Sequence, residues 1–117
     1  MNDIVDRYVA TWNSTSREER DGQLAEHWSS DVTYVDPLAD VRGHAELSEL
    51  IDGVREQFPT FTFSPLGEVD AHHQQARFRW ALGPADGEPL VVGFDVIVLD
   101  DDGRIRDVRG FLDKVPA

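Results

Sequence analysis

The chain has 117 residues, 40% of them hydrophobic, and its 23 acidic residues outnumber its 11 basic ones to give a net charge of −12. This length fits one domain of about 100–150 residues, so we expect residues 1–117 to form a single domain. The hydrophobic content argues against a disordered chain. The negative charge argues against nucleic acids and anionic membranes as partners, because both require a basic surface.

The chain contains no cysteine, which excludes disulfides, thiolate nucleophiles and cysteine-bound metals. The first residues, Met1-Asn2-Asp3-Ile4, lack the basic start and the apolar run of a signal peptide. No apolar stretch approaches the roughly 20 residues of a membrane span. We therefore expect a cytoplasmic protein.

The N-terminal half shows helical periodicity in three segments. The first covers residues 3–13, the second begins at a capping box formed by Ser16 and Glu19 and ends near residues 29–31, and the third covers residues 44–57. The residues expected to face the core are Ile4, Tyr8 and Trp12 from the first helix, Leu24, Ala25 and Trp28 from the second, and Leu47, Leu50, Ile51, Val54 and Phe58 from the third.

Strand patterns dominate the rest of the chain. A short β-branched and aromatic strand at residues 32–35 separates the second helix from the third. Four antiparallel strands are expected afterwards, around residues 61–63, 75–82, 90–99 and 104–112. Three helices on one face of a strongly curved, mostly antiparallel sheet make a cone-shaped α+β fold. Such a cone encloses a cavity that suits a small molecule.

Asp95 is the strongest candidate for chemistry, because it lies within the apolar strand segment 91–99. A buried ionised carboxylate is costly unless it is paired or protonated. Asp95 therefore faces a cavity with a raised pKa, pairs with Arg79 or Arg109 on a neighbouring strand, or points to solvent.

Asp36 and Tyr8 are two further candidates. Asp36 lies between a strand end and Pro37, where it is either a site residue or an ordinary turn former. Tyr8 lies on the apolar face of the first helix, where a buried hydroxyl needs a partner. An ordinary core tyrosine fits the same pattern.

Several segments resemble the nuclear transport factor two-like superfamily, in particular its ketosteroid isomerase and SnoaL-like polyketide cyclase branch. They are Arg7-Tyr8-Val9-Ala10, the run from Asp31 to Pro37, Gly43 before the third helix, and Asp95-Val96 followed by Asp101-Asp102-Gly103-Arg104-Ile105. The resemblance covers nearly the whole chain in order and implies the cystatin-like cone fold. The superfamily includes isomerases, cyclases, hydrolases, dehydratases and non-enzymatic binders, so the fold alone leaves the activity open.

The resemblance also implies roles for the three candidates. In ketosteroid isomerases a helix tyrosine and a strand aspartic acid form the oxyanion hole, and an aspartate before a proline is the general base. Tyr8, Asp95 and Asp36 fall on these positions, and no cofactor is implied. A carboxylic acid donates a hydrogen bond only where an apolar site keeps it protonated, as ketosteroid isomerase itself illustrates.

Two departures from the isomerase pattern bear on the substrate. The third helix has Leu50-Ile51-Asp52 where the isomerases carry a tyrosine that supports the oxyanion tyrosine, and Trp12 replaces a smaller aliphatic residue. Both changes favour a small or flat carbonyl compound over a steroid. The residues expected to bind this substrate are Trp12, Phe58, Trp80 and Leu112.

No metal site is expected. His72 and His73 are adjacent at the end of a hairpin, and consecutive strand residues point to opposite faces, which favours a surface turn. The acidic run at residues 100–102 lacks the spaced ligands of a calcium loop. His27 and His44 are expected to be structural or exposed, with His44 within reach of the pocket mouth.

Three functions fit these features. The first is cofactor-free proton transfer on a small hydrophobic carbonyl compound, by isomerisation or aldol-type cyclisation, and the carboxylates Asp36 and Asp95 favour it. The second is non-catalytic binding of a small apolar ligand, favoured by the missing supporting tyrosine. The third is a partner-binding domain that uses the open sheet face, which the lack of an evident apolar stripe argues against. A hydrolase with an Asp-Arg-Asp set that uses Arg79 or Arg109 stays open.

The strand pattern further predicts a homodimer. Val92, Val96 and Val98 alternate with Asp95 and Ile97, so the outer side of the sheet is apolar in places. Two such faces can pack isologously, and the family resemblance implies the same assembly.

Overall fold

The computed structural model describes residues 2–116. In chain order its elements are α1 (Asn2–Trp12), α2 (Arg17–His27), β1 (Trp28–Val35), β2 (Asp40–Arg42), α3 (Gly43–Gln57), β3 (Thr62–His72), β4 (Gln75–Gly83), β5 (Val91–Leu99) and β6 (Ile105–Lys114). The strands form one sheet in the order β2-β1-β6-β5-β4-β3. Strands β1 and β6 run parallel, and the other neighbours run antiparallel.

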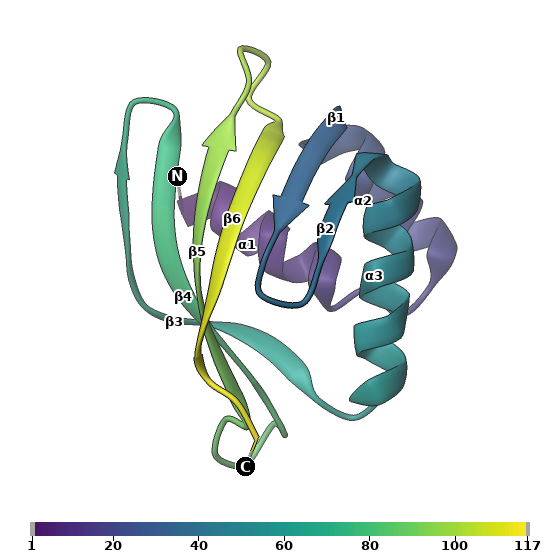
Figure 1. Ribbon diagram of the computed structural model, residues 1–117, viewed down its shortest axis with the longest axis vertical. Coiled ribbons are helices and arrows are strands. Elements are labelled where there is room, and N and C mark those ends of the chain that lie inside the picture. Colours follow the sequence, from purple (N-terminus) through teal and green to yellow (C-terminus); the bar gives the residue numbers. More distant parts are fainter. Residues whose placement is uncertain (1, 117) are drawn as a thin grey trace.

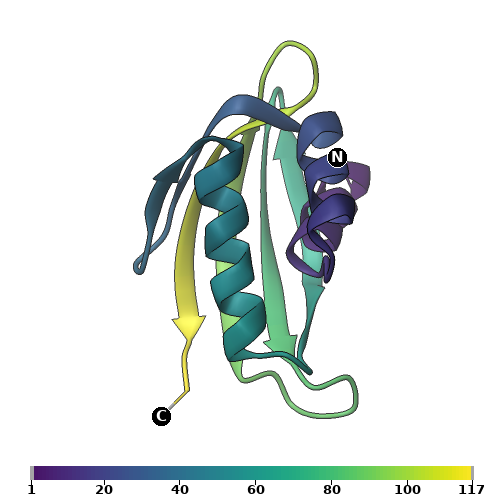
Figure 2. The same cartoon turned by 90° about the vertical axis from the view of Figure 1, so that its right-hand side faces the viewer.

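The helices cover one side of the curled sheet, as the sequence predicts. Helices α1 and α2 pass behind the strands, and α3 stands beside β2 (Figure 1). Figure 2 shows α1 and α2 together on the side that faces away from the viewer in Figure 1. The opposite side of β4, β5 and β6 carries no helix in the described residues, and we call it the outer face.

The core lies between the helices and the concave side of the sheet. Leu47, Ile51, Ile97 and Ile105 are fully buried there. Each such side chain contributes about 1.5–3 kcal/mol by leaving water. The wide apolar stripes of α1 and α3 and the alternating strands therefore account for the cone.

The helix ends follow the sequence in part. The Ser16 hydroxyl accepts a hydrogen bond from the Glu19 N–H at 3.0 Å, which confirms the capping box. The prediction that α2 continues to residues 29–31 was wrong, since α2 ends at His27 and Trp28 already has extended backbone. Ala25, expected in the core, is exposed.

Trp28 reaches the core from a strand instead of a helix. Its indole N–H donates to the Thr11 hydroxyl at 3.1 Å, and its ring stacks on Tyr8 at a centroid distance of 5.3 Å. These contacts stabilise an extended backbone at Trp28, which explains why α2 ends earlier than predicted.

The strand predicted at residues 32–35 is the end of a longer strand with two partners. Tyr34 pairs with Val41 of the short β2 on one side and with Val108 of β6 on the other. The parallel pairing joins segments that lie far apart in sequence, so local patterns do not reveal it. The four later strands pair antiparallel, as predicted.

Two surface turns match their sequence patterns. Asp100 accepts hydrogen bonds at 2.9 Å from the N–H groups of Asp102 and Arg104, and Gly103 takes a positive φ of 81°. His72 and His73 are exposed at the end of the β3–β4 hairpin. Within residues 2–116, no helix is long and apolar enough to cross a membrane.

Candidate active site

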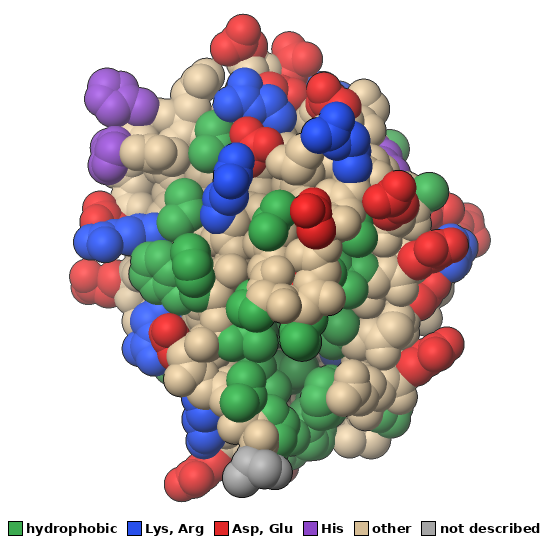
Figure 3. Space-filling model, in the orientation of Figure 1, with side chains coloured by type: hydrophobic (Ala, Val, Ile, Leu, Met, Phe, Trp, Pro, Cys, Tyr) green, Lys and Arg blue, Asp and Glu red, His purple; other side chains and the backbone are tan. Residues whose placement is uncertain are grey.

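A cavity of about 420 Å³ lies between the concave side of the sheet and helices α1 and α3. Its wall is made mainly of aliphatic and aromatic side chains, and Leu38 and Val115 line it although they are 84% and 56% exposed. Figure 3 shows hydrophobic side chains gathered on the lower half of the molecule, around a hollow. This volume suits a small ligand.

The structure places all four residues expected to bind substrate on this wall. They are Trp12, Phe58, Trp80 and Leu112. Trp28 and Phe78 lie in the core, 0% and 2% exposed, and are not part of the wall.

Trp80 fits on the wall because Gly93 lies directly beneath its indole. A Cβ atom at Gly93 would lie 2.1 Å from a ring carbon of Trp80. Any side chain larger than hydrogen at this position would displace the indole.

Tyr8 and Asp95 form a buried pair. The Tyr8 hydroxyl donates a hydrogen bond to Asp95 Oδ2, and the two residues are 3% and 1% exposed. Tyr8 lines the cavity, whereas Asp95 lies behind it and is not part of the wall. The alternative pairing with Arg79 is wrong, because Arg79 contacts Asp113 at 3.5 Å. Asp95 forms no ion pair with Arg109 within the described residues, since its partner is the Tyr8 hydroxyl.

Burial raises the pKa of Asp95 to about 6, and the nearby charge of Asp36 adds to this effect. Hydrogen bonds from Tyr8 and Trp80 oppose the rise, because they favour the ionised carboxylate. Burial also raises the pKa of Tyr8 well above its ordinary value. The raised pKa of Asp95 is the one that the apolar strand pattern predicts.

Asp36 is on the cavity wall and is held by three donors. Its Oδ2 accepts from the Tyr34 hydroxyl at 2.7 Å, and its Oδ1 accepts from the N–H groups of Leu38 and Ala39, each at 2.8 Å. A carboxylate has about four acceptor positions, so one stays available. Asp36 is therefore both a turn former and a wall residue.

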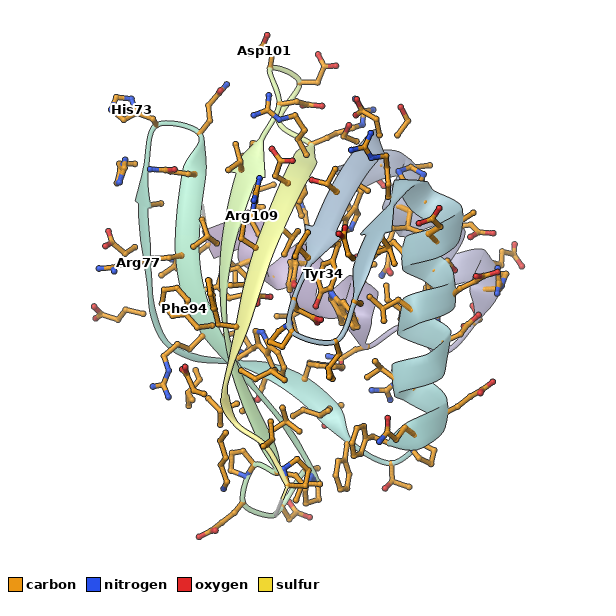
Figure 4. All side chains as sticks on the ribbon, viewed as in Figure 1. Tyr34, His73, Arg77, Phe94, Asp101 and Arg109 are labelled. Carbon is orange, nitrogen blue, oxygen red and sulfur yellow. The ribbon has the colours of Figure 1, made fainter. Side chains whose placement is uncertain are left out.

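Tyr34 is the site residue that the sequence did not single out. It lies near the middle of the molecule in Figure 4, lines the cavity and is 4% exposed. Burial raises its pKa well above the ordinary value. The available signal was its spacing, because residues two apart on a strand share one face, and Tyr34 precedes Asp36 by two.

Gly110 brings the two carboxylates together. A Cβ atom at Gly110 would lie 2.7 Å from Asp95 Oδ1 and 3.3 Å from the Cβ of Asp36. The two acidic side chains thus flank one glycine of β6, which the cross-strand pairing of Asp95 with Gly110 also shows.

His44 does not reach the cavity. Its Nε2 lies 2.9 Å from the Ser29 carbonyl oxygen and 3.1 Å from that of Trp28. It therefore joins the start of α3 to the start of β1. Among the described wall residues, Asp36 is the only acidic one, and none is Lys, Arg or His.

The fold and the site define a class: a cone-shaped α+β protein whose apolar cavity is lined by Tyr8, Tyr34 and Asp36, with Asp95 behind Tyr8. The SnoaL-like domain family matches residues 5–108, and the chain belongs to this family.

Solved structures agree with this assignment. A candidate isomerase of the SnoaL-like family from Agrobacterium tumefaciens is 36% identical, with 94% of each chain covered and a TM-score of 0.89. A candidate polyketide cyclase from Sinorhizobium meliloti is 20% identical, with 92% of this chain and 93% of that chain covered and a TM-score of 0.71. A candidate SnoaL-like polyketide cyclase from a Jannaschia species is 15% identical, with 95% and 83% covered and a TM-score of 0.74. The last two show the fold alone. No curated protein matches the chain.

Proposed function

We propose that this protein catalyses cofactor-free proton transfer on a small, neutral carbonyl compound held in the cavity. The observation that carries the proposal is the placement of Tyr8 and Asp36 on one apolar wall, with Asp95 behind Tyr8. The 36% identical relative described as a candidate isomerase supports the same class of reaction.

Each group has a role in the proposed step. Asp36 takes a proton from the carbon next to the carbonyl, and the C–H electron pair forms the carbon–carbon double bond of an enolate. The carbonyl π electrons move to the oxygen, where the Tyr8 hydroxyl donates to the developing charge. In a substrate with a β,γ double bond the enolate is conjugated with it. Asp36 then returns the proton to the γ-carbon while the oxygen electrons re-form the carbonyl, which completes an isomerisation. In a cyclase the enolate carbon instead attacks a second carbonyl of the same substrate.

Asp95 acts through Tyr8. Protonated Asp95 donates a hydrogen bond to the Tyr8 oxygen, so the Tyr8 hydroxyl is free to donate to the substrate. Ionised Asp95 instead accepts the hydrogen bond of the Tyr8 hydroxyl. Asp95 is therefore a positioning residue, and its pKa of about 6 sets when Tyr8 can donate.

The charge of the wall supports a neutral substrate. Asp36 is held by hydrogen bonds, and the described wall carries no basic side chain that would bind an anion. The Asp36 carboxylate on the wall would repel a substrate carboxylate at close range.

The test is hydrogen–deuterium exchange at the α-carbon of small cyclic enones and ketones, followed by NMR. We expect wild-type protein to accelerate exchange over buffer and Asp36→Asn to abolish the acceleration. Asp40→Asn is the matched control, because Asp40 is an exposed carboxylate at the start of β2 that is not part of the wall. If Asp36→Asn protein still accelerates the exchange, Asp36 is not the base.

A second candidate function is ligand binding without turnover. The specific observation in its favour is that three donors already hold the Asp36 carboxylate and occupy most of its acceptor positions. Ligand binding by wild-type protein without any exchange above buffer would select this function.

We also propose that two copies associate through the outer face. Phe111 is 57% exposed there and lies 6.5 Å from the ring of Phe94, whereas Val92, expected on this face, is buried. Arg77 and Arg109 lie on the same side (Figure 4), and Arg77 contacts Asp70 at 3.0 Å. A patch with exposed aromatics and charges of both signs suits a self-complementary contact. The strand pattern indicated this face through Val96 and Val98, which are partly exposed, but not through Phe94 and Phe111.

A further inference from the structure

The indole N–H of Trp12 is a buried donor without an acceptor. Trp12 is 5% exposed and lines the cavity, and its Nε1 has no hydrogen-bond partner among residues 2–116. The indole N–H of Trp28, in contrast, donates to the Thr11 hydroxyl at 3.1 Å. A buried donor left unpaired is costly and rare in native proteins, so the Trp12 N–H calls for a partner.

The indole cannot easily turn to find another partner. Its ring packs against Tyr34 and Phe63, each at a centroid distance of 5.5 Å. The main chain fixes it as well, because Trp12 is the last residue of α1 and follows Tyr8 by one helical turn on the same face.

The neighbouring polar group is the Tyr8 hydroxyl. The rings of Tyr8 and Trp12 lie 6.5 Å apart, and the Trp12 indole is near enough to lower the pKa of Tyr8, although its N–H makes no hydrogen bond of ordinary geometry to the Tyr8 oxygen. The Tyr8 proton is already donated to Asp95. When Tyr8 donates to Asp95, the Trp12 N–H is therefore the donor at this end of the cavity that is available to a ligand.

We propose that the Trp12 indole N–H binds the carbonyl oxygen of the ligand, next to the Tyr8 hydroxyl. The sequence alone suggested Trp12 only as a bulky side chain that narrows the cavity. As a donor it selects ligands that present a hydrogen-bond acceptor at this end, and it continues to donate when Asp95 is ionised and Tyr8 is not available. The choice of a carbonyl ligand rests on the proposed function.

The aromatic wall adds a preference for flat molecules. Phe63 contacts both Trp12 and Trp80, with ring centroids 5.5 Å and 5.3 Å away. A bicyclic aromatic ketone offers a flat face for these rings and one acceptor for the indole.

The test compares 1-tetralone with tetralin, which have nearly the same shape but differ in the carbonyl. Each is titrated into ¹⁵N-labelled wild-type protein, and the indole N–H resonances are followed by NMR. We expect 1-tetralone, and not tetralin, to shift the Trp12 indole proton downfield. A resonance that neither compound moves, or that both move equally, would overturn the assignment.

The variant Trp12→Phe keeps an aromatic wall and removes the N–H. We expect its affinity for 1-tetralone to fall about tenfold, as for loss of one hydrogen bond, with little change for tetralin. Phe58→Leu is the matched control, since it shortens the wall elsewhere without removing a hydrogen-bond donor and should weaken both compounds alike. Equal losses for both compounds in Trp12→Phe would show that Trp12 is only wall.

The two proposals fail separately. A ketone-specific shift of the Trp12 indole without any α-proton exchange would leave the donor role intact and reject the enzyme. Exchange that is catalysed by wild-type and Trp12→Phe protein at the same rate, without the indole shift, would reject the donor role and keep the enzyme.

Discussion

Replacing Asp95 by asparagine should make the protein less sensitive to alkaline pH. Burial raises the pKa of Asp95 from 3.8 to about 6 in the folded state, so the folded protein holds the proton more tightly than the unfolded chain. The stabilisation from this tighter binding is complete below pH 3.8 and is lost as pH rises through about 6. Asparagine cannot ionise, and the variant lacks this pH dependence.

The magnitude follows from the shift. A rise from 3.8 to about 6 corresponds to roughly 3 kcal/mol, at about 1.4 kcal/mol per pKa unit. Part of this loss occurs below pH 5, and linkage leaves about half of it between about pH 5 and about pH 8. The free energy of unfolding of wild-type protein should therefore fall by this amount relative to Asp95→Asn over the same interval.

Urea denaturation of both proteins at the two pH values measures this double difference. Asp86→Asn is the control, because Asp86 is exposed in the β4–β5 loop and its replacement should leave the wild-type pH dependence unchanged. A double difference near zero, or of opposite sign, would refute the reasoning that desolvation dominates at Asp95.

Three further changes test the geometry. Tyr8→Phe removes the hydroxyl that favours ionised Asp95, so the pKa of Asp95 should rise above about 6 in a carboxyl NMR titration. Gly110→Ala places a methyl group 2.7 Å from Asp95 Oδ1 and should destabilise the protein by about 1–3 kcal/mol in thermal unfolding. Gly53→Ala, in a helix and with no atom near the new methyl group, should instead stabilise it by about 0.5–1 kcal/mol. Phe111→Glu should yield a species of 13.2 kDa in light scattering where wild-type protein gives twice that mass; a wild-type monomer would refute the dimer.

Short-range patterns revealed most of the site. The helical spacing of Tyr8 and Trp12 placed them on one face of α1, and the apolar surroundings of Asp95 indicated a buried carboxylate. Both inferences need only the spacing of hydrophobic residues within a single helix or strand, which can be read from the sequence.

The missing parts depend on contacts between distant segments. Gly110 and Asp36 are neighbours because β1 runs parallel to β6, and no local signal encodes this pairing. The position of Asp95 behind Tyr8, instead of on the wall, likewise depends on how α1 packs against β5. The two-residue spacing between Tyr34 and Asp36 could have placed both side chains on one face. The role of Tyr34, however, requires knowing that the inner face of β1 borders the cavity.

The pH dependence of catalysis should follow from the position of Asp95 behind Tyr8. Above about pH 6 the ionised Asp95 accepts the hydrogen bond of the Tyr8 hydroxyl. The fraction of protein in which Tyr8 can donate to the substrate therefore falls about tenfold per pH unit. In Asp95→Asn the amide donates to the Tyr8 oxygen at every pH and keeps the Tyr8 proton free for the substrate. Rates of α-proton exchange measured from about pH 6 to about pH 8 should therefore decline for wild-type protein and stay level for the variant. A wild-type rate that is constant over this interval, or a variant that declines in parallel, would mean that Asp95 does not control the direction of the Tyr8 hydrogen bond.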